Sequence, residues 1–251
     1  YDEILSSSKT IMNGENNKDM YGWGSIWIQN ESLACCFLSF YWALGGPDMV
    51  NDKGEFTFDY AIAEKAFQMM SDFVYKYRIS PEGIGSFDTN TLRNSVMAGN
   101  IAFDSDWLSG WAKYNSDSSS VNGKMKIAAM PGNGALGGWG VMVSAYSRNK
   151  EAAARFAAFR AGYDAQKRAV ETVKQVPTLK SFYDGTTTIE GFEYLESFLE
   201  PLNAARPRGL TPYYAAVSSK IQVESSAVVC GMKPPKEAAI SLQAGISSVV
   251  D

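Results

Sequence analysis

The sequence contains no histidine among its 251 residues. This absence excludes Ser-His-Asp and Cys-His catalytic arrangements, histidine-ligated zinc, and the side chain that most often acts as a general base near neutral pH. Apolar runs are also short, and none approaches the roughly 18 residues that a membrane-spanning helix needs. The sequence therefore gives no sign of histidine-dependent catalysis or of a membrane-spanning helix.

Cysteine and blocks of like charge are scarce as well. Cys35 and Cys36 are adjacent in an apolar run and Cys230 stands alone, a pattern that gives no disulfide framework and favours buried structural thiols. The 27 acidic and 23 basic residues are scattered and leave a formal charge of -4. Neither nucleic acid nor a membrane surface is therefore indicated as a partner, and a neutral or polar small molecule fits better.

Apolar residues at helical spacing predict most of the secondary structure. Asn30 is a suitable N-cap for a helix that the glycine pair at Gly45 ends, and Asp59 is a suitable N-cap for a second helix. A short helix over 90–99 then leads into a buried strand over 101–103. Further expected elements are helices over 1–14, 149–159, 191–205, 213–231 and 235–250, a short helix within 170–186, and strands within 123–135 and over 140–145.

Polar and aromatic side chains follow the strand over 101–103. Asp104, Asp106 and Trp107 stand at its carboxyl end, just before the next helix. In open α/β sheets ligands bind at that edge, because the strand ends and the following helix starts leave a crevice with free N–H groups. These three residues are therefore candidates for ligand contact.

A second candidate lies in a glycine-rich stretch. Trp139 stands between Gly138 and Gly140 and runs directly into the expected strand over 140–145. The glycines allow the backbone to approach a ligand closely and leave the indole exposed. In the helix that follows, Ala152, Phe156 and Phe159 are expected to form the inner face.

Three segments resemble one family when they are taken in order along the chain. They are LRNSVMAGNIAFDSDWLSGW (92–111), GGWGVMVSAYSRNKEAAARFAAF (137–159), and ARPRGLTPYYAAVSSKIQ (205–222) continuing to PPKEAAISLQAGI (234–246). They are similar to segments of the extracytoplasmic solute-binding proteins of ABC importers, in the sugar-binding group that includes maltose- and trehalose-binding proteins. The opening helix over 1–14 is also similar to a helix of this family.

The resemblance implies an α/β protein with the type II periplasmic-binding-protein fold, in which two α/β lobes enclose a ligand cleft. Residues 1–140 and 192–251 would form the second lobe, and residues 141–191 would be a remnant of the first lobe with the hinge crossings. The family's signal peptide and the leading part of its first lobe have no counterpart here. We therefore expect this chain to be an N-terminally truncated form of a longer protein.

The implied function is the capture of a sugar, a di- or oligosaccharide, in the cleft and its delivery to the permease subunits of an ABC importer. No catalytic residue, metal ion or cofactor is implied. The implied location is extracytoplasmic, in the periplasm or at the cell surface, as in a lipoprotein. Membrane contact would come only through the permease or through a lipid anchor missing from this chain.

A sugar site combines charged or amide side chains, which bind hydroxyls, with aromatic rings that cover the C–H faces. Arg208 resembles a position at which the family presents an arginine to its ligand. The full set of candidate ligand-binding residues is Trp139, Gly138, Trp107, Asp104, Asp106, Arg208, Tyr213, Tyr214, Trp27 and Asn30.

Each of these side chains also has an ordinary structural role open to it. Core packing would explain the tryptophans, and Trp107 could share a packing face with Trp111. Helix capping would explain the aspartates and Asn30, and a solvated surface would explain Arg208. One of the two tyrosines is expected to face the cleft and the other the core, but the sequence does not say which.

Two other functions remain open from the sequence. A glycoside hydrolase could use Asp104 and Asp106 as a carboxylate pair, since residues two apart on a strand share a face. The chain could also be a non-catalytic scaffold or interaction domain, and the grouping of Trp and Asp at strand ends would then be a coincidence. Release of reducing ends from oligosaccharides would indicate the hydrolase, and thermal stabilisation by sugars would argue against the scaffold.

Overall fold

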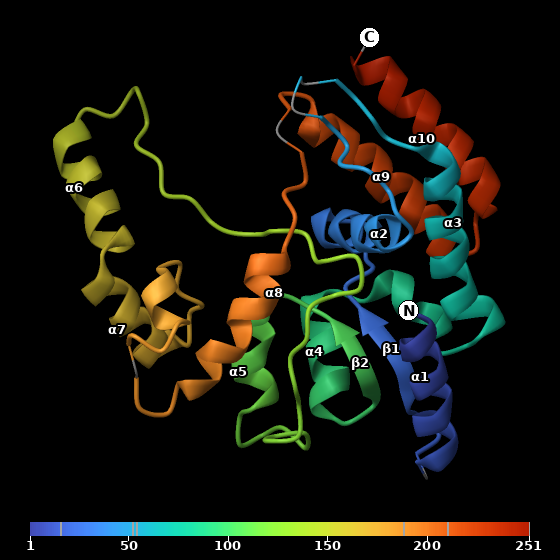
Figure 1. Cartoon of the computed structure of the whole chain (residues 1–251), viewed down its shortest axis with the longest axis horizontal. Helices are drawn as coiled ribbons and strands as arrows, with labels where there is room; N and C mark the ends of the chain where they lie inside the picture. The colour runs from blue at the N-terminus through green and yellow to red at the C-terminus, as the bar shows by residue number, and fades with distance from the viewer. Residues whose placement is uncertain (16, 52, 54, 188, 210, 251) are drawn as a thin grey trace.

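A computed structural model describes residues 1–15, 17–51, 53, 55–187, 189–209 and 211–250. Two short parallel strands, β1 (Tyr21–Ser25) and β2 (Ile101–Ser105), pair with Trp23 opposite Phe103. The strands run side by side through the larger body of the molecule (Figure 1). Because they are parallel, Ser25 and Ser105 end at the same edge of the sheet.

Helices pack around this pair of strands. In the larger body they are α1 (Asp2–Gly14), α2 (Glu31–Ala43), α3 (Tyr60–Ser71), α4 (Thr89–Met97), α5 (Trp111–Tyr114), α9 (Tyr214–Val229) and α10 (Pro235–Val250). The expected caps are confirmed, because Asn30 accepts the backbone N–H of Ser32 and Asp59 accepts that of Ala61. Both side chains thereby satisfy amides that a helix start leaves free.

The main core forms around α2. All ten of its residues from 33 to 42 are buried, so this helix is apolar on every side, as a central helix must be. The Phe37 ring packs 4.5 Å from Phe67 of α3, and the Phe40 ring stacks 4.3 Å from Tyr1. Helices α9 and α10 complete the enclosure.

A second core lies beside α5. It contains Val170, Phe182, Ile189, Phe192, Leu195 and Phe198, among others. These residues come from α7 (Tyr163–Val173), the 3-10 helices Lys180–Phe182 and Glu193–Phe198, and the chain between them, with α8 (Leu199–Ala204) following. Trp111 of α5 contacts this core, edge to face with Phe198 at 6.2 Å.

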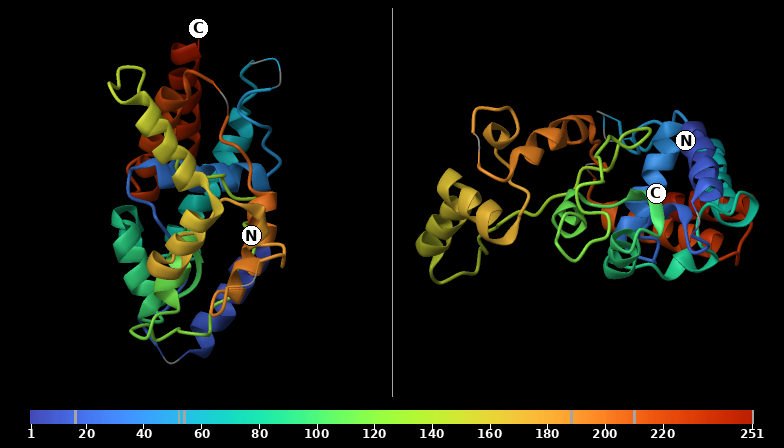
Figure 2. Two further views of the ribbon diagram at one scale, coloured as in Figure 1. Left: turned by 90° about the vertical axis from the view of Figure 1, so that its left-hand side faces the viewer. Right: turned by 90° about the horizontal axis from the view of Figure 1, so that it is seen from below.

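The helix α6 (Lys150–Ala161) lies at the far end of the molecule, reached by a long irregular segment (Figures 1 and 2). The strands expected within 123–135 and over 140–145 do not form; among the described residues this region has a single bridge, between Ala135 and Arg206. A strand needs a neighbour for its backbone groups, and no segment among the described residues pairs with 140–145.

The prediction that Ala152, Phe156 and Phe159 form a buried inner face of α6 is also wrong for this chain. The Phe156 and Phe159 side chains are 59% and 62% exposed, Ala152 is exposed, and α6 has no buried residue. Cys35 and Cys36 are buried as expected, but Cys230 is exposed at the end of α9. The part of the chain that the structure describes contains no helix long and apolar enough to cross a membrane.

Candidate functional site

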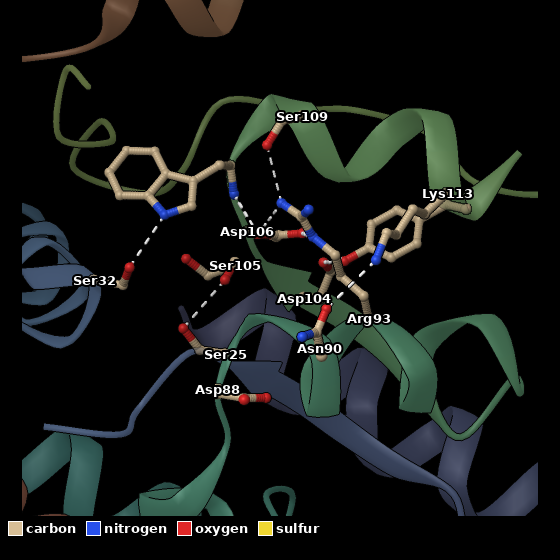
Figure 3. A network of polar contacts seen from close by, with 12 residues as sticks. Ser25, Ser32, Asp88, Asn90, Arg93, Asp104, Ser105, Asp106, Ser109 and Lys113 are labelled. Atoms are coloured by element: carbon tan, nitrogen blue, oxygen red, sulfur yellow. Dashed lines mark hydrogen bonds and ion pairs between the residues drawn. The ribbon is translucent and has the colours of Figure 1, made fainter. Parts of the chain in front are cut away.

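The carboxyl end of β2 carries a buried charge network, drawn in Figure 3. Asp106 forms an ion pair with Arg93 of α4, with 2.6 Å between Oδ2 and Nε, and Arg93 Nη2 also donates to Oδ1 at 3.1 Å. The Trp107 backbone N–H donates to Asp106 at 2.7 Å. The structure therefore places Asp106 as the anchor that holds the turn after β2.

Asp104 shares a partner with Asp106. The Tyr114 hydroxyl lies 2.8 Å from Asp104 and 2.9 Å from Asp106, and it can donate its single proton to only one of them at a time. Burial, followed by the nearby Asp106 charge, raises the pKa of the Asp104 carboxyl from 3.8 to about 6. Burial beside the same two carboxylates raises the pKa of Tyr114 well above its usual range.

Trp107 links the strand end to the glycine-rich stretch. Its indole N–H donates to Ser32 at the start of α2 at 3.1 Å. A Cβ atom at Gly137 would lie 2.4 Å from the Trp107 ring, so only glycine lets the backbone approach this closely. Trp107 and Trp111 do not share a packing face, because Trp111 belongs to the second core.

A small cavity of about 80 Å³ lies next to Trp107. Hydroxyl groups and main chain meet there at the edge where both strands end, since Ser25 and Ser105 contribute to its lining. The remaining lining residues are Ile26, Ser32, Cys35, Cys36, Ser39, Asp106, Trp107, Met130, Gly134 and Ala135. The cavity can accept a hydroxyl-sized group from a ligand placed over the strand ends.

Trp139 and Gly138 stand apart from this network. The Trp139 side chain is fully exposed, as the flanking glycines predict, and Gly138 has open space around it. Neither residue contacts the aspartates at the strand end. Trp139 thus offers a free aromatic face, while Trp107 has its indole N–H and part of its ring engaged.

Arg208 and Tyr214 meet at Glu31, the first residue of α2. Arg208 Nη1 lies 2.5 Å from Glu31 Oε1, and the Tyr214 hydroxyl donates to the same oxygen. Burial, followed by the bond to Glu31, raises the pKa of Tyr214 well above its usual range. Tyr213 is 46% exposed. The two adjacent tyrosines therefore differ, with Tyr214 tied to α2 and Tyr213 turned to solvent.

Trp27 and Asn30 are occupied by structural contacts. The Trp27 side chain is fully buried in the main core, and its indole N–H donates to Cys36 Sγ at 3.0 Å. Asn30 accepts the Ser32 N–H at 2.8 Å as the cap of α2. In this conformation Trp27 has no surface left for a ligand.

Sequence reasoning missed Arg93, Tyr114 and Glu31. Arg93 and Tyr114 lie 13 and 8 residues from Asp106, on opposite sides of it along the chain. Arg93 falls within the family-like segment 92–111, but nothing in that segment indicated that its side chain would pair with Asp106. Glu31 directly follows the Asn30 cap, where an acidic residue is common because of the helix dipole. Among the described residues, no group of three or more Cys, Asp and Glu side chains is placed to hold a metal ion.

Comparisons with known proteins agree on one family. The profile of the family described as "bacterial extracellular solute-binding protein" matches residues 1–167. A protein of Deinococcus radiodurans, named "probable ABC transporter-binding protein", is 26% identical over 221 residues. That alignment covers 84% of this chain but 52% of the relative, so the chain spans about half the length of this curated relative.

Solved structures of similar proteins match nearly the whole chain. The maltose-bound MalE3 of T. maritima superposes with a TM-score of 0.89 at 27% identity, covering 100% of this chain and 65% of MalE3. The GacH receptor of Streptomyces glaucescens, solved unliganded and with acarbose, gives a TM-score of 0.82 at 19% identity, covering 99% of this chain and 63% of GacH. At that lower identity the match shows the fold alone, which is the expected type II fold.

Proposed function

Since this chain belongs to the bacterial extracellular solute-binding protein family, we propose that it is part of the substrate-binding component of an ABC importer for a carbohydrate. The observation that carries the proposal is the superposition of the whole chain on MalE3, a protein whose structure contains maltose. The proposed protein captures a di- or oligosaccharide in an interlobe cleft and delivers it to membrane permease subunits. Its location is then extracytoplasmic.

The candidate residues support a sugar as the ligand. Trp139 supplies an exposed aromatic face, and the lining of the cavity beside Trp107 includes four serine residues. Arg208 uses one of its guanidinium nitrogens on Glu31 and Cys35. Aromatic faces and planar donors are the two elements that sugar recognition combines. We assign Trp139, Arg208 and the exposed Tyr213 as direct ligand contacts.

We propose that the other candidate residues support these ligand contacts without touching the ligand themselves. Asp106 holds the turn that presents Trp107, Asp104 shares the Tyr114 hydroxyl with it, and Gly138 leaves Trp139 free. Asn30 caps α2, and Tyr214 joins α9 to α2. Because the oxygens of Asp106 are engaged by Arg93 and by the Trp107 N–H, it is a poor partner for Asp104 in glycoside hydrolysis. We therefore propose a binding protein rather than an enzyme.

The two lobes are assigned along the chain as follows. Residues 1–140 and 192–251 form the second lobe, and 141–191 belong to the first. The exposed Phe156 and Phe159 of α6, together with the exposed Val141 and Met142, support this assignment, because exposed apolar surface of this kind normally meets another part of a protein. The sugar then bridges the lobes and shifts the protein toward a closed form that the permease recognises.

Calorimetric titration of the full-length protein with maltose, trehalose and a small glycan panel tests the proposal. We expect one sugar to bind, and the W139A and R208A variants to bind it at least roughly tenfold more weakly. The Y60A variant is the control, because Tyr60 is exposed at the start of α3. Absence of sugar binding, or release of reducing ends from the oligosaccharides, would contradict the proposal.

A further inference from the structure

Both carboxylate oxygens of Glu31 are occupied by donors from a distant part of the chain. Oε1 accepts from Arg208 Nη1 and from the Tyr214 hydroxyl. Oε2 accepts from Ser218 Oγ at 2.5 Å and from Gln222 Nε2 at 3.4 Å. Glu31 begins α2, whereas its partners lie on α9 and in the loop before it. One side chain thus joins these three segments.

The donors on α9 lie on one face of the helix, toward the Glu31 carboxylate. Tyr214, Ser218 and Gln222 follow one another at intervals of four residues, so they share one face of the helix. The Gln222 amide also donates to Ser218 at 3.0 Å, which orders the hydroxyl that faces Glu31. These three side chains donate to the same carboxylate, so together they hold the Glu31 carboxylate at one position on α9.

The cluster contributes little to stability through its charges alone. The Glu31 and Arg208 side chains are 40% and 27% exposed, and ion pairs this open to water contribute about 0–1 kcal/mol. What the contacts do fix is the direction of the arginine. Arg208 is held at Nη1 by Glu31, and its guanidinium carbon lies 5.4 Å from the Tyr214 ring centroid.

The remaining guanidinium nitrogens of Arg208 stay available. With the residues that the structure describes, Nε and Nη2 form no hydrogen bond, whereas Nη1 bonds to Glu31 and to Cys35 Sγ. We propose that Glu31 is a positioning residue for sugar recognition, which orients Arg208 so that Nε and Nη2 donate to ligand hydroxyls. This inference rests on the proposed function, because it takes the Arg208 ligand to be a carbohydrate.

A double-mutant cycle in the full-length protein tests the inference. Glu31→Gln keeps the side-chain length but replaces one acceptor oxygen with an NH2 group, which donates and cannot accept from the facing donors. We expect E31Q and R208A each to weaken sugar binding at least roughly tenfold, and the double variant to bind no more weakly than R208A. If E31Q does not fold, E31D gives the same test, because its shorter side chain keeps the negative charge but moves the carboxylate away from Arg208.

The matched control is Glu224→Gln. Glu224 lies on α9, the helix that carries three of the Glu31 donors, and forms an ion pair with Lys233 at 2.7 Å, so its replacement removes a similar contact without touching Arg208. We expect its sugar affinity to stay within twofold of the parent protein. If the fold-losses of sugar affinity in E31Q and R208A multiply in the double variant, the inference is overturned, because Glu31 then acts independently of Arg208.

A crystal structure of the E31Q protein without sugar separates this inference from the proposed function. We expect the Arg208 guanidinium to leave its place beside the Tyr214 ring. An unchanged Arg208 position would overturn the positioning role, whether or not any sugar binds. If the parent protein binds no sugar, the proposed function fails, and the position of Arg208 in the variant still decides whether Glu31 orients it.

Discussion

Asp104 is the residue for which the structure predicts the clearest pH dependence. Its folded-state pKa of about 6 lies above the unfolded value of 3.8, so the folded protein binds the proton more tightly. The stabilising contribution is therefore complete below the unfolded pKa and is lost as pH rises through the folded pKa. Well above pH 6, the buried charge costs roughly 2–3 kcal/mol.

Replacement of Asp104 by Asn removes this cost and keeps an oxygen that accepts from the Tyr114 hydroxyl. We expect D104N to raise the free energy of unfolding near pH 7.5 and to change it little near pH 4, measured by urea unfolding at both pH values. A loss of stability that is larger near pH 7.5 than near pH 4 would show that the Asp104 charge is instead favourable, through its attraction to Arg93.

Asp88 provides a control of opposite sign. Hydrogen bonds from Thr91, first from its backbone N–H, lower the pKa of Asp88, because they favour the charged carboxylate at the start of α4. Its stabilising contribution is present above the unfolded pKa and is lost as pH falls through the folded pKa. D88N is therefore expected to give no gain of stability near pH 7.5, unlike D104N.

At this residue scale the sequence predicted where some of the candidate residues lie. Asp104, Asp106 and Trp107 meet at a strand end because their positions follow directly from a short apolar strand. The buried partners Arg93 and Tyr114 were not predictable, since each approaches the aspartates only after α4 and α5 fold back on β2. Glu31 was missed for the same reason, because the donors from Arg208, Tyr214, Ser218 and Gln222 arrive from α9 and the loop before it.

At the scale of single elements, variants of Asn30, the N-cap of α2, can separate a structural role from a ligand-binding role. The Asn30 side chain accepts from the N–H groups of Ser32 at 2.8 Å and Leu33 at 3.4 Å. We expect Asn30→Ala to lower the free energy of unfolding by about 1 kcal/mol, and Asn30→Ser to restore most of the loss. Unfolding in urea measures both variants, and an unchanged stability of N30A would contradict the capping role.

The cap of α3 is the matched control. Asp59 accepts from Ala61 at 2.9 Å and Ile62 at 3.1 Å, so Asp59→Ala should cost about as much stability, roughly 1 kcal/mol, and leave sugar affinity unchanged. Sugar binding by N30S then settles the second role of Asn30. Weaker binding by this stable variant would indicate a ligand contact, and unaltered binding would leave Asn30 as a cap alone.

The elements predicted well are those with local signals. The bounds of α2 follow from the Asn30 cap and from Gly45, which takes a φ of +88° just after the helix. The strand expected over 140–145 had an equally clear apolar pattern, yet Val141 and Met142 are exposed and unpaired among the described residues. Helices satisfy their own backbone groups, whereas strands depend on a partner that the sequence pattern does not supply.

At the scale of the whole molecule, the segments 130–149 and 199–209 run between the main core and the second core. They meet where the Arg206 N–H donates to Gly134 and the Leu136 N–H donates to Arg206, both at 2.8 Å. The Arg206 guanidinium lies 4.7 Å from the Trp42 ring and pairs with Asp48. The crossing is thus anchored to the end of α2, while α6 extends away from it (Figure 2).

The exposed face of α6 permits a test of the proposed lobe assignment. Phe159 is 62% exposed, so in this chain of 251 residues F159A should change the free energy of unfolding by less than about 0.5 kcal/mol. If residues 141–191 pack within a complete first lobe, the same substitution in a protein as long as the relatives should cost roughly 3–5 kcal/mol. Phe198, 1% exposed in the second core, is the control, because F198A should cost that much in both chains. An equally small effect of F159A in both chains, measured by urea unfolding, would contradict the assignment of α6 to the first lobe.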